Sequence, residues 1–414
     1  MKVLLLGSGG REYTFCHHLA KSPHQPQLFI APGNAGTAQF GTNIDVLPTD
    51  FEGLKQAVLN HEIEMVIVGP EVPLVEGVVD FFAADQELAY IPVIGPSKQG
   101  AELEGSKEFA KAFMQRHNIP TAAYQSFTKG TLSEGLTYLE TVTPPYVLKA
   151  DGLAAGKGVV ILNDLAEAKA ELTAMLEDAK FGQASQKVVI EEFLDGIELS
   201  CFVLTDGKSY KILPMAKDYK RIGEGDTGLN TGGMGAVSPV PFADEAFVQK
   251  IKEQVVAPTM RGLHQDGIPY VGFVFIGLIK VGDNPKVIEY NVRMGDPETQ
   301  VVLPRIQNDL FELLQATASG TLDSIKLSID KRSVSTIVAV SGGYPESYDK
   351  GKAIRGIDPN DFVVHAGTAM VDEELVTSGG RVLSATGVGA DHNQAIAQSY
   401  QALAKIDFEG IYYR

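Results

Sequence analysis

The sequence predicts a multidomain fold of mixed α/β and α+β class: an N-terminal doubly wound domain with a parallel sheet, a core of two α+β subdomains and a small mixed C-terminal domain. The 414 residues are enough for two to four domains of roughly 100–200 residues each. In the first hundred residues short apolar runs alternate with helical patterns, as in a parallel sheet with helices on both faces. From residue 101 onward pairs of strands dominate. We therefore divide the chain into residues 1–100, 101–330 and 331–414, with a subdomain over about 121–192.

The N-terminal elements follow from short all-apolar runs that end at turn residues, which suits strands buried on both faces. Helical patterns lie between these runs. The expected strands are Val3–Leu6, Gln27–Ala31, Met65–Val68 and Ile91–Gly95, and the expected helices include Arg11–Lys21 and Pro73–Ala84.

The core begins with one expected helix, Ala101–His117, which stops before Pro120. The segment Lys217–Val237 is rich in Gly, Asp and Thr and lacks apolar periodicity, so we expect a long functional loop. The remaining core elements are strands Tyr146–Lys149, Val159–Leu162 and Lys187–Phe193, helix Asp164–Asp178, and the strand pairs Glu198–Thr205 with Ser209–Pro214 and Tyr270–Val281 with Lys286–Arg293. The tail is expected to contain strands Thr336–Val340, Phe362–Gly367 and Arg381–Thr386 and helix Asn393–Lys405.

Composition excludes several classes of function. Lys and Arg total 35 and Asp and Glu total 52, so the net charge is 35 − 52 = −17, which disfavours a broad nucleic-acid surface. Two cysteines rule out a disulfide framework. No apolar run approaches the roughly 18 residues of a membrane helix. We expect a cytoplasmic protein, monomeric, with small-molecule partners and neither nucleic acid nor membrane as a partner.

The first glycine loop, Gly7–Glu12, follows a strand and opens a helix, so its N–H groups and the helix dipole can bind an anion. Glu12 takes the place of the last glycine of a dinucleotide fingerprint, and the second strand ends in Ala31-Pro32 without a ribose-binding acid, so NAD is disfavoured. Arg11 opposes the helix dipole, and an incoming dianion would explain it. A plain tight turn is the alternative.

The second glycine loop runs from Lys149 to Gly158 and is not a Walker A motif. Three residues, rather than four, separate Gly152 from Gly156, and Gly158 stands where a Ser or Thr would bind magnesium. Because the loop joins two strands, a flap over phosphates that carries Lys157 fits better. Lys149 ends an apolar strand, where its charge needs a partner such as a phosphate; a snorkelling surface lysine is the alternative.

A third constellation is Glu289, Asn291 and Arg293, which alternate on one strand and share a face. A carboxylate beside an amide oxygen suits magnesium, and the arginine can bind an anion bidentately. A solvated strand face is the alternative, made weaker by the acids of the adjoining Gly295–Glu298 loop. The acidic segment Glu191–Glu198 is a weaker signal for adenine and ribose.

Taken together these motifs resemble the ATP-grasp superfamily, and more closely the phosphoribosylamine–glycine ligase family, over the whole chain. The resemblance is carried by GSGGRE, APGNAGT, IVGPEVPLVEG, LEGSK, KADGLAAGKGV, EEFLDGIE, DTGLNTGGMGA, GDPETQ, HAGT and GGRVL, in this order. It implies ATP-dependent ligation of glycine to 5-phosphoribosylamine through a glycyl phosphate, giving glycinamide ribonucleotide, ADP and phosphate in purine synthesis. Another ATP-grasp carboxylate–amine ligase of purine synthesis, or a non-catalytic nucleotide-binding regulator, is the alternative.

The resemblance also implies site residues, with ATP as co-substrate and Mg²⁺ or Mn²⁺ as cofactor and a nucleotide flap that moves. The implied ATP-binding residues are Lys107, Lys149, Gly152, Gly156, Lys157, Gly158, Glu191, Glu192, Leu194 and Glu198. The implied metal ligands are Glu289 and Asn291, and the implied catalytic residues are Lys149, Arg293 and Asp296. The implied substrate-binding residues are Gly10, Arg11, Asn34, Asp218, Lys220, Arg221, Gly232, Gly233 and Met234.

Three positions depart from the family pattern. Many members have His where this chain has Tyr13 and Tyr219, and a tyrosine does not exchange protons near neutral pH as His does. Many ATP-grasp enzymes carry a metal-binding Glu at the position of Gly277. We therefore expect the protein to supply few metal ligands and the phosphates to supply more.

Overall fold

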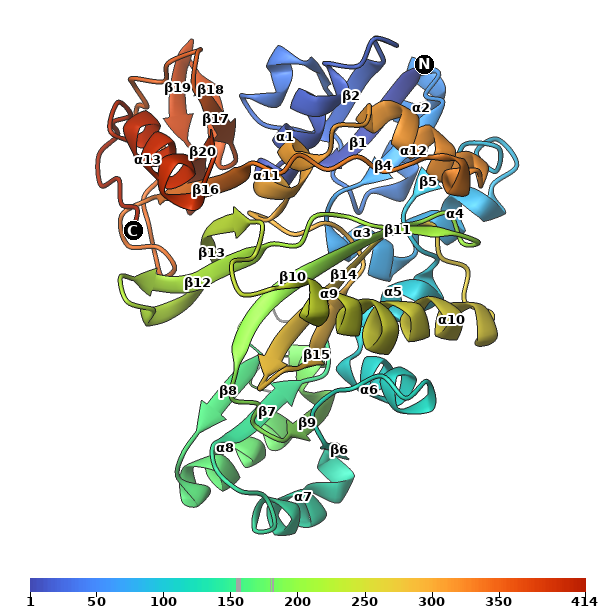
Figure 1. Ribbon diagram of the computed structural model, residues 1–414, viewed down its shortest axis with the longest axis vertical. Helices are drawn as coiled ribbons and strands as arrows, with labels where there is room; N and C mark the ends of the chain where they lie inside the picture. The colour runs from blue at the N-terminus through green and yellow to red at the C-terminus, as the bar shows by residue number, and fades with distance from the viewer. Residues whose placement is uncertain (154–157, 179, 181) are drawn as a thin grey trace.

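The computed structural model describes residues 1–153, 158–178, 180 and 182–414, and it confirms the mixed multidomain class (Figure 1). The N-terminal sheet is parallel, with the order β3-β2-β1-β4-β5. Its strands are β1 (Lys2–Gly7), β2 (Gln27–Pro32), β3 (Gly41–Asn43), β4 (Met65–Val68) and β5 (Val93–Ile94).

The two faces of this sheet are covered by different helices because side chains alternate along β1. Leu4 and Leu6 pack in the core that includes α2 (Phe51–His61), whereas Val3 and Leu5 pack with α1 (Gly10–Leu19) and α12 (Leu310–Ser319). Helix α12 lies within the expected core range 101–330 but packs on the N-terminal sheet (Figure 1). A residue range alone therefore does not separate the first two units.

Two expected helices are each broken in two. The expected helix Pro73–Ala84 is α3 (Glu71–Glu76) and α4 (Val78–Ala84), separated by Gly77, whose left-handed backbone (φ 98°) ends α3. The expected helix Ala101–His117 is α5 (Lys98–Gly105) and α6 (Lys107–Arg116). Ser106 lies between them with an extended backbone, and its side chain accepts a hydrogen bond from the Phe109 N–H as the cap of α6.

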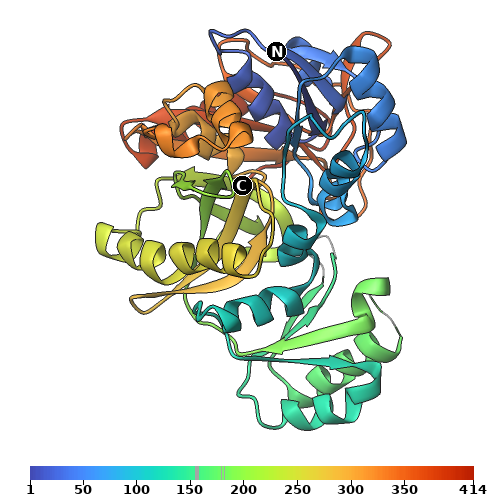
Figure 2. The same ribbon diagram turned by 90° about the vertical axis from the view of Figure 1, so that its right-hand side faces the viewer.

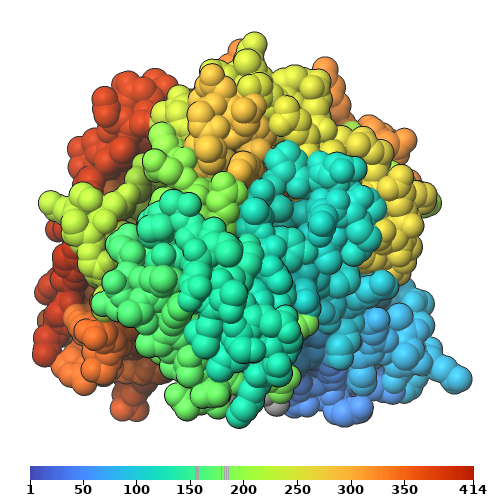
Figure 3. Space-filling model, turned by 90° about the horizontal axis from the view of Figure 1, so that it is seen from below, coloured from blue at the N-terminus to red at the C-terminus, as the bar shows by residue number. Residues whose placement is uncertain are grey.

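A separate lobe below the rest of the molecule holds the expected 121–192 unit (Figures 1 and 2). Its sheet has the order β6-β9-β7-β8 and packs on its own apolar cluster with α7 and α8. Seen from below, the lobe occupies the centre of that face, with red C-terminal atoms at one edge and blue N-terminal atoms at the other (Figure 3). The elements are β6 (Tyr124–Thr128), β7 (Tyr146–Ala150), β8 (Val159–Leu162), β9 (Lys187–Glu191), α7 (Leu132–Leu139) and α8 (Leu165–Glu177).

The larger core sheet has the order β11-β10-β14-β15 and is antiparallel. Its strands, which agree with the two expected pairs, are β10 (Ile197–Thr205), β11 (Tyr210–Ile212), β14 (Gly272–Val281) and β15 (Asn284–Asn291). Helices α9 (Glu245–Ile251) and α10 (Ala257–Gln265), joined by a π-helical turn at Lys252–Val256, contribute to the same apolar core.

The expected loop Lys217–Val237 is wrong: it forms a hairpin of β12 (Lys217–Gly223) and β13 (Thr227–Ser238). Apolar burial is confined to the second half of β13, and the rest of the hairpin is held by backbone pairing, so the apolar pattern gave little signal. β13 also pairs with β16 (Ser333–Val340), which places the hairpin in the C-terminal sheet, of order β12-β13-β16-β20-β17. The remaining elements are β17 (Phe362–His365), β18 (Thr368–Val371), β19 (Glu374–Thr377), β20 (Arg381–Gly389), α11 (Thr299–Val302) and α13 (His392–Leu403).

Candidate active site

Three buried side chains meet where β7, β9 and α6 converge. Lys149 Nζ and Lys111 Nζ each lie 3.0 Å from the same carboxylate oxygen of Glu191, and all three side chains are less than 10% exposed. The partner that the charge of Lys149 needs is therefore a protein carboxylate in this structure. Lys111 was missed by sequence analysis, although its spacing of four residues from Lys107 places both on one face of a helix.

Lys107 begins α6 beside the start of the second glycine loop. Its Nζ donates to the Gly152 carbonyl (3.1 Å), and burial lowers its pKa, with Glu289 acting in the opposite direction and Lys149 in the same one. The Gly158 carbonyl accepts from Ala150 N (2.8 Å). Gly156 and Lys157 lie outside the described residues.

The acidic side chains at the end of β9 and after it contact several different partners. Glu192 accepts from Ala123 N (3.2 Å) and lies 3.6 Å from Lys286 Nζ. Leu194 is half-buried, and Glu198 pairs with Lys220 (3.0 Å) on β12. The carboxylates of Glu191, Glu192 and Glu198 are thus already engaged by protein cations.

The two expected metal ligands lie on β15, next to β14. Gly277 is paired with Glu289 across the strands, and a Cβ built on Gly277 would lie 3.1 Å from Glu289 Cγ. An acid at this position would therefore meet Glu289. Within the described residues the half-buried Glu289 carboxylate has no hydrogen bond or ion pair, while Asn291 Oδ1 accepts from Arg293 Nη2 (3.3 Å). An unpaired, half-buried carboxylate beside an amide oxygen is a suitable place for a hard cation.

Arg293 is held by two acids that sequence analysis did not single out. Its Nη2 donates to Glu104 (2.8 Å), and its Nε lies 3.3 Å from a Glu71 carboxylate oxygen without making a hydrogen bond. Both acids lie within quoted motifs, IVGPEVPLVEG and LEGSK. The guanidinium expected to bind an anion is therefore largely neutralised from the N-terminal side.

The N-terminal loop is filled by protein carboxylates. Gly9 N donates to Glu12 (2.6 Å), Arg11 N donates to Asp296 (3.3 Å), and the Arg11 side chain pairs with Glu12 (2.6 Å). Arg11 is therefore paired with the carboxylate of the next residue in the chain, and its role toward a bound anion stays a prediction. A Cβ at Gly10 would meet Gln300 Nε2 at 2.6 Å, so this loop packs tightly on α11.

The Asn34 side chain makes four hydrogen bonds with the described residues. Its Nδ2 donates to the carbonyls of Ser8 (2.8 Å) and His365 (3.1 Å), and its Oδ1 accepts from the N–H groups of Gly36 and Thr37. The side chain thus joins the N-terminal loop to the C-terminal domain.

The β12–β13 hairpin is held from the C-terminal domain. Arg381 Nη1 donates to the carbonyls of Gly232 (2.9 Å) and Asp296 (2.6 Å). Two features require glycine at position 233. Its backbone has φ 121°, which other residues rarely adopt, and a Cβ there would lie 2.5 Å from Pro297. Met234 is 1% exposed in an apolar cluster with strand β16, so its side chain packs in the core.

Two buried acids lie between β10, β12 and α11. Asp218 is 9% exposed, and Glu298 is 4% exposed and accepts from Ser200 Oγ (3.2 Å). Burial, reinforced by the charge of Asp218, raises the pKa of Glu298 to about 7, and burial also raises the pKa of Asp218. Lys220 lies near both Asp218 and Glu198, whereas Arg221 donates to Gly228 (2.8 Å) inside its own hairpin. Glu298 was not among the predicted site residues.

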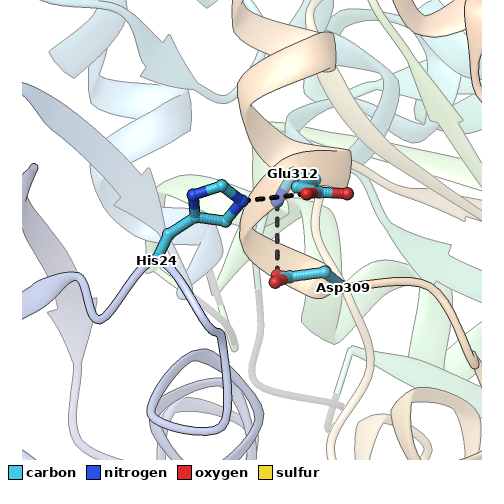
Figure 4. Close-up of side chains that lie close together, drawn as sticks. All are labelled: His24, Asp309 and Glu312. Carbon is cyan, nitrogen blue, oxygen red and sulfur yellow. Dashed lines mark hydrogen bonds and ion pairs between the residues drawn. The ribbon is translucent and has the colours of Figure 1, made fainter.

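Away from these residues, His24, Asp309 and Glu312 bring their ligand atoms within 4.8 Å of one another (Figure 4). Asp309 caps α12 and accepts from Ser22, and His24 pairs with Glu312 at 2.8 Å. These contacts account for the cluster, which joins the N-terminal domain to α12. No helix in the described part of the chain is long and apolar enough to cross a membrane.

Family models match the chain in three consecutive parts. The N domain of phosphoribosylglycinamide synthetase matches residues 1–104, its ATP-grasp (A) domain residues 105–299 and its C domain residues 334–414. A phosphoribosylamine–glycine ligase of Chlorobaculum tepidum is 45% identical over 424 residues, which cover 100% of this chain and 98% of that protein. A bifunctional purine biosynthetic protein of Pichia angusta is 44% identical over 424 residues, and this chain spans 53% of its length.

Solved structures give the same match. A phosphoribosylamine–glycine ligase from Thermotoga maritima superposes with a TM-score of 0.87 at 34% identity, covering 100% of this chain and 99% of that one. A biotin carboxylase from Campylobacter jejuni, 14% identical, superposes with a TM-score of 0.77 over 100% of this chain and 92% of that one, a likeness of fold alone.

Proposed function

The chain belongs to the phosphoribosylglycinamide synthetase family, and from this we propose that it ligates glycine to 5-phosphoribosylamine with ATP as co-substrate, giving glycinamide ribonucleotide, ADP and phosphate in purine biosynthesis. One electrostatic observation carries the proposal. The charges of Lys149 in the lobe and of Glu289 on the core sheet both act on the pKa of Lys107. Cations of α6 and β7 and a metal-type acid of β15 are therefore close enough for their charges to interact, as the phosphates of a metal-bound nucleotide require.

Enzymes of the ATP-grasp fold generally use ATP with Mg²⁺ or Mn²⁺. We assign the ion to Glu289 and Asn291, because Glu289 makes no hydrogen bond or ion pair among the described residues and the Asn291 amide oxygen lies on the same face of β15. When bound, the ion neutralises phosphate charge. Gly277, opposite Glu289, adds no ligand, so the nucleotide must complete the coordination.

The chemistry requires an activated carboxylate, since the oxyanion of glycine is a poor leaving group. Transfer of the γ-phosphoryl group to the glycine carboxylate gives glycyl phosphate. The amine of phosphoribosylamine then attacks the carbonyl carbon, the C–N bond forms, and phosphate leaves. In this proposal Lys107 and Lys149 hold the nucleotide phosphates, and the protein acts mainly by positioning and by charge neutralisation.

We assign phosphoribosylamine to the junction of the three domains. Arg11, Asp296 and the Gly232–Gly233 stretch of β13 meet there, with Asp218 and Lys220 on the neighbouring strand β12. A site built from all three domains can close over an acyl phosphate and keep water away from it. We further propose that the enzyme acts as a cytoplasmic monomer.

The deciding experiment measures phosphate release from ATP with glycine, in the presence and absence of phosphoribosylamine. The proposal predicts release that depends on both substrates, with glycinamide ribonucleotide formed in equal amount. Release with a different carboxylate or amine would favour another ATP-grasp ligase. ATP binding without any release would favour a nucleotide-binding regulator.

A further inference from the structure

Lys111 has no place in the mechanism so far, yet it is one of the most deeply buried cations of the described chain. Its side chain is 2% exposed and makes two short contacts, 3.0 Å to the Glu191 carboxylate and 2.8 Å to Thr121 Oγ1. Thr121 in turn donates to the Val287 carbonyl (2.7 Å) on β15. The ammonium group is therefore fixed by α6, β9 and, through Thr121, the core sheet.

The charges at this point do not balance. Two ammonium groups share one carboxylate oxygen, and Glu191 is the only acid within ion-pair distance of either in the described residues. Burial lowers the pKa of Lys111 to about 8, with Lys149 acting in the same direction and Glu191 in the opposite one. A buried excess of positive charge is unfavourable until an anion enters, and the nucleotide phosphates are the anion that the proposed function supplies.

We propose that Lys111 is a positioning residue that keeps Glu191 paired when Lys149 leaves this carboxylate for the phosphates of ATP. The inference rests on the proposed function, because it takes the nucleotide as the incoming anion. Before binding, Glu191 holds both lysines. After binding, Lys149 contacts phosphate, and the Lys111–Glu191 pair alone remains buried.

Without Lys111, moving Lys149 from Glu191 to the nucleotide phosphates has a large cost in free energy. Lys149 and Glu191 would then form a neutral one-to-one pair, and removing Lys149 would leave a buried carboxylate with no cation. Nucleotide binding would have to break that pair. Losing a hydrogen bond to a charged group corresponds to roughly 10- to 150-fold in an equilibrium constant, so we expect a weakening of that order.

The test measures binding of a non-hydrolysable ATP analogue with Mg²⁺ to the full chain by titration calorimetry, with thermal unfolding of each variant alongside. Lys111→Met should weaken binding by roughly 10- to 150-fold. The double variant Lys111→Met/Glu191→Gln removes the carboxylate that would retain Lys149, so it should bind the analogue more tightly than Lys111→Met does. Lys187→Met is the matched control, because the half-buried Lys187–Glu108 pair joins the same two elements in a more exposed position; its affinity should match wild type.

Each outcome bears on a different statement. A Lys111→Met variant that binds the analogue as tightly as wild type overturns the inference, and so does weak binding that Glu191→Gln does not rescue, since that pattern indicates a merely structural lysine. Wild-type protein that binds no analogue overturns the proposed function and the inference together. Tight wild-type binding without phosphate release overturns only the proposed activity.

Discussion

The Arg11 guanidinium and the Glu12 carboxylate form a buried ion pair, 2.6 Å from Nε to Oε1, in the first turn of α1. Glu12 also accepts from Gly9 N (2.6 Å), and Asp296 accepts from Arg11 N. The helix N-terminus thus receives its negative charge from within the protein. Arg11 is held where it compensates these acids, so its first role is structural.

Replacing Arg11 by Met should destabilise the protein, because Glu12 is 1% exposed and would lose its only ion-pair partner among the described residues. Breaking a buried pair typically costs about 3–5 kcal/mol in the free energy of unfolding, and the Gly9 N–H group that remains favours the lower end. Urea unfolding measures the change. Arg116→Met, which breaks an exposed pair with Asp266, is the control and should cost at most about 1 kcal/mol.

A stability change as small as that of the control would contradict the structural role of Arg11. If unfolding is unchanged while the apparent KM for phosphoribosylamine rises, the residue acts on substrate instead. An altered apparent KM for ATP would indicate that the loop acts at the ATP site and not at the phosphoribosylamine site.

Replacing Asn291 by Leu should weaken metal dependence rather than nucleotide affinity. Leu has a similar size but no oxygen ligand, so more Mg²⁺ should be needed for half-maximal rate. A metal titration at saturating ATP measures this. Asn284→Leu, at the exposed far end of the same strand, is the control and should leave the titration unchanged. An identical midpoint for Asn291→Leu and wild type would make Asn291 a structural residue that only orients Arg293.

The sequence predicted the regular parts of this fold because its signals there are local. All-apolar runs marked β1, β2 and β4, and the Asp206-Gly207 turn marked the β10–β11 hairpin. The failures also have local causes. Gly77 and Ser106 each break a continuous apolar pattern, and β12 and β13 are made by backbone pairing that leaves little apolar trace.

The sequence motifs indicated which segments contribute to the candidate site, but not which of their side chains pair with one another. Glu71, Glu104 and Arg381 all lie within the quoted motifs, yet their contacts join segments 85 or more residues apart, as in Arg381 with Asp296. Spacing along one chain segment carries no information about such pairs. Lys111 was also missed, although its helical spacing from Lys107 would have been sufficient to indicate it.

Because His365 is buried, we expect the protein to lose stability in acid. Burial lowers its pKa from 6.5 to about 4 in the native state, where the ring is stacked on Tyr13 at the junction of the N- and C-terminal domains. The native state therefore binds fewer protons than the unfolded state below pH 6.5. The stabilisation is fully present above about pH 6.5 and is lost toward pH 4, at about 1.4 kcal/mol per pH unit.

Urea unfolding at pH 7 and pH 5 measures this dependence. His365→Asn should remove part of the slope, whereas His264→Asn, an exposed control on α10, should not. Part of the slope should remain, because burial also lowers the pKa of His17 and of His18. A His365→Asn variant with the full wild-type slope would contradict the buried neutral imidazole.

Arg381 should matter for catalysis although it lies in the C-terminal domain. Its guanidinium donates to the carbonyls of Gly232 and Asp296 and lies 3.7 Å from the Asp296 carboxylate. Burial alone would raise the pKa of Asp296, but Arg381 and Arg11 hold it below its usual value. Arg381 thus fixes both the position and the ionisation of an acid at the junction of the domains.

Arg381→Met should therefore reduce kcat/KM for phosphoribosylamine by about 10- to 100-fold, since misplacing a site by about 1 Å can cost a factor of about 100. It should also raise the pKa of Asp296, so the acid limb of the pH–rate profile should move to higher pH. Arg381→Lys keeps the charge but not the two-pronged geometry, so it should restore the acid limb more fully than the rate.

ATP affinity should not change, because Lys107 and Lys149 lie on other elements. Arg355→Met, an exposed arginine of the same domain, is the control. A lower rate with an unmoved acid limb would mean that Arg381 only holds the hairpin in place and does not control Asp296.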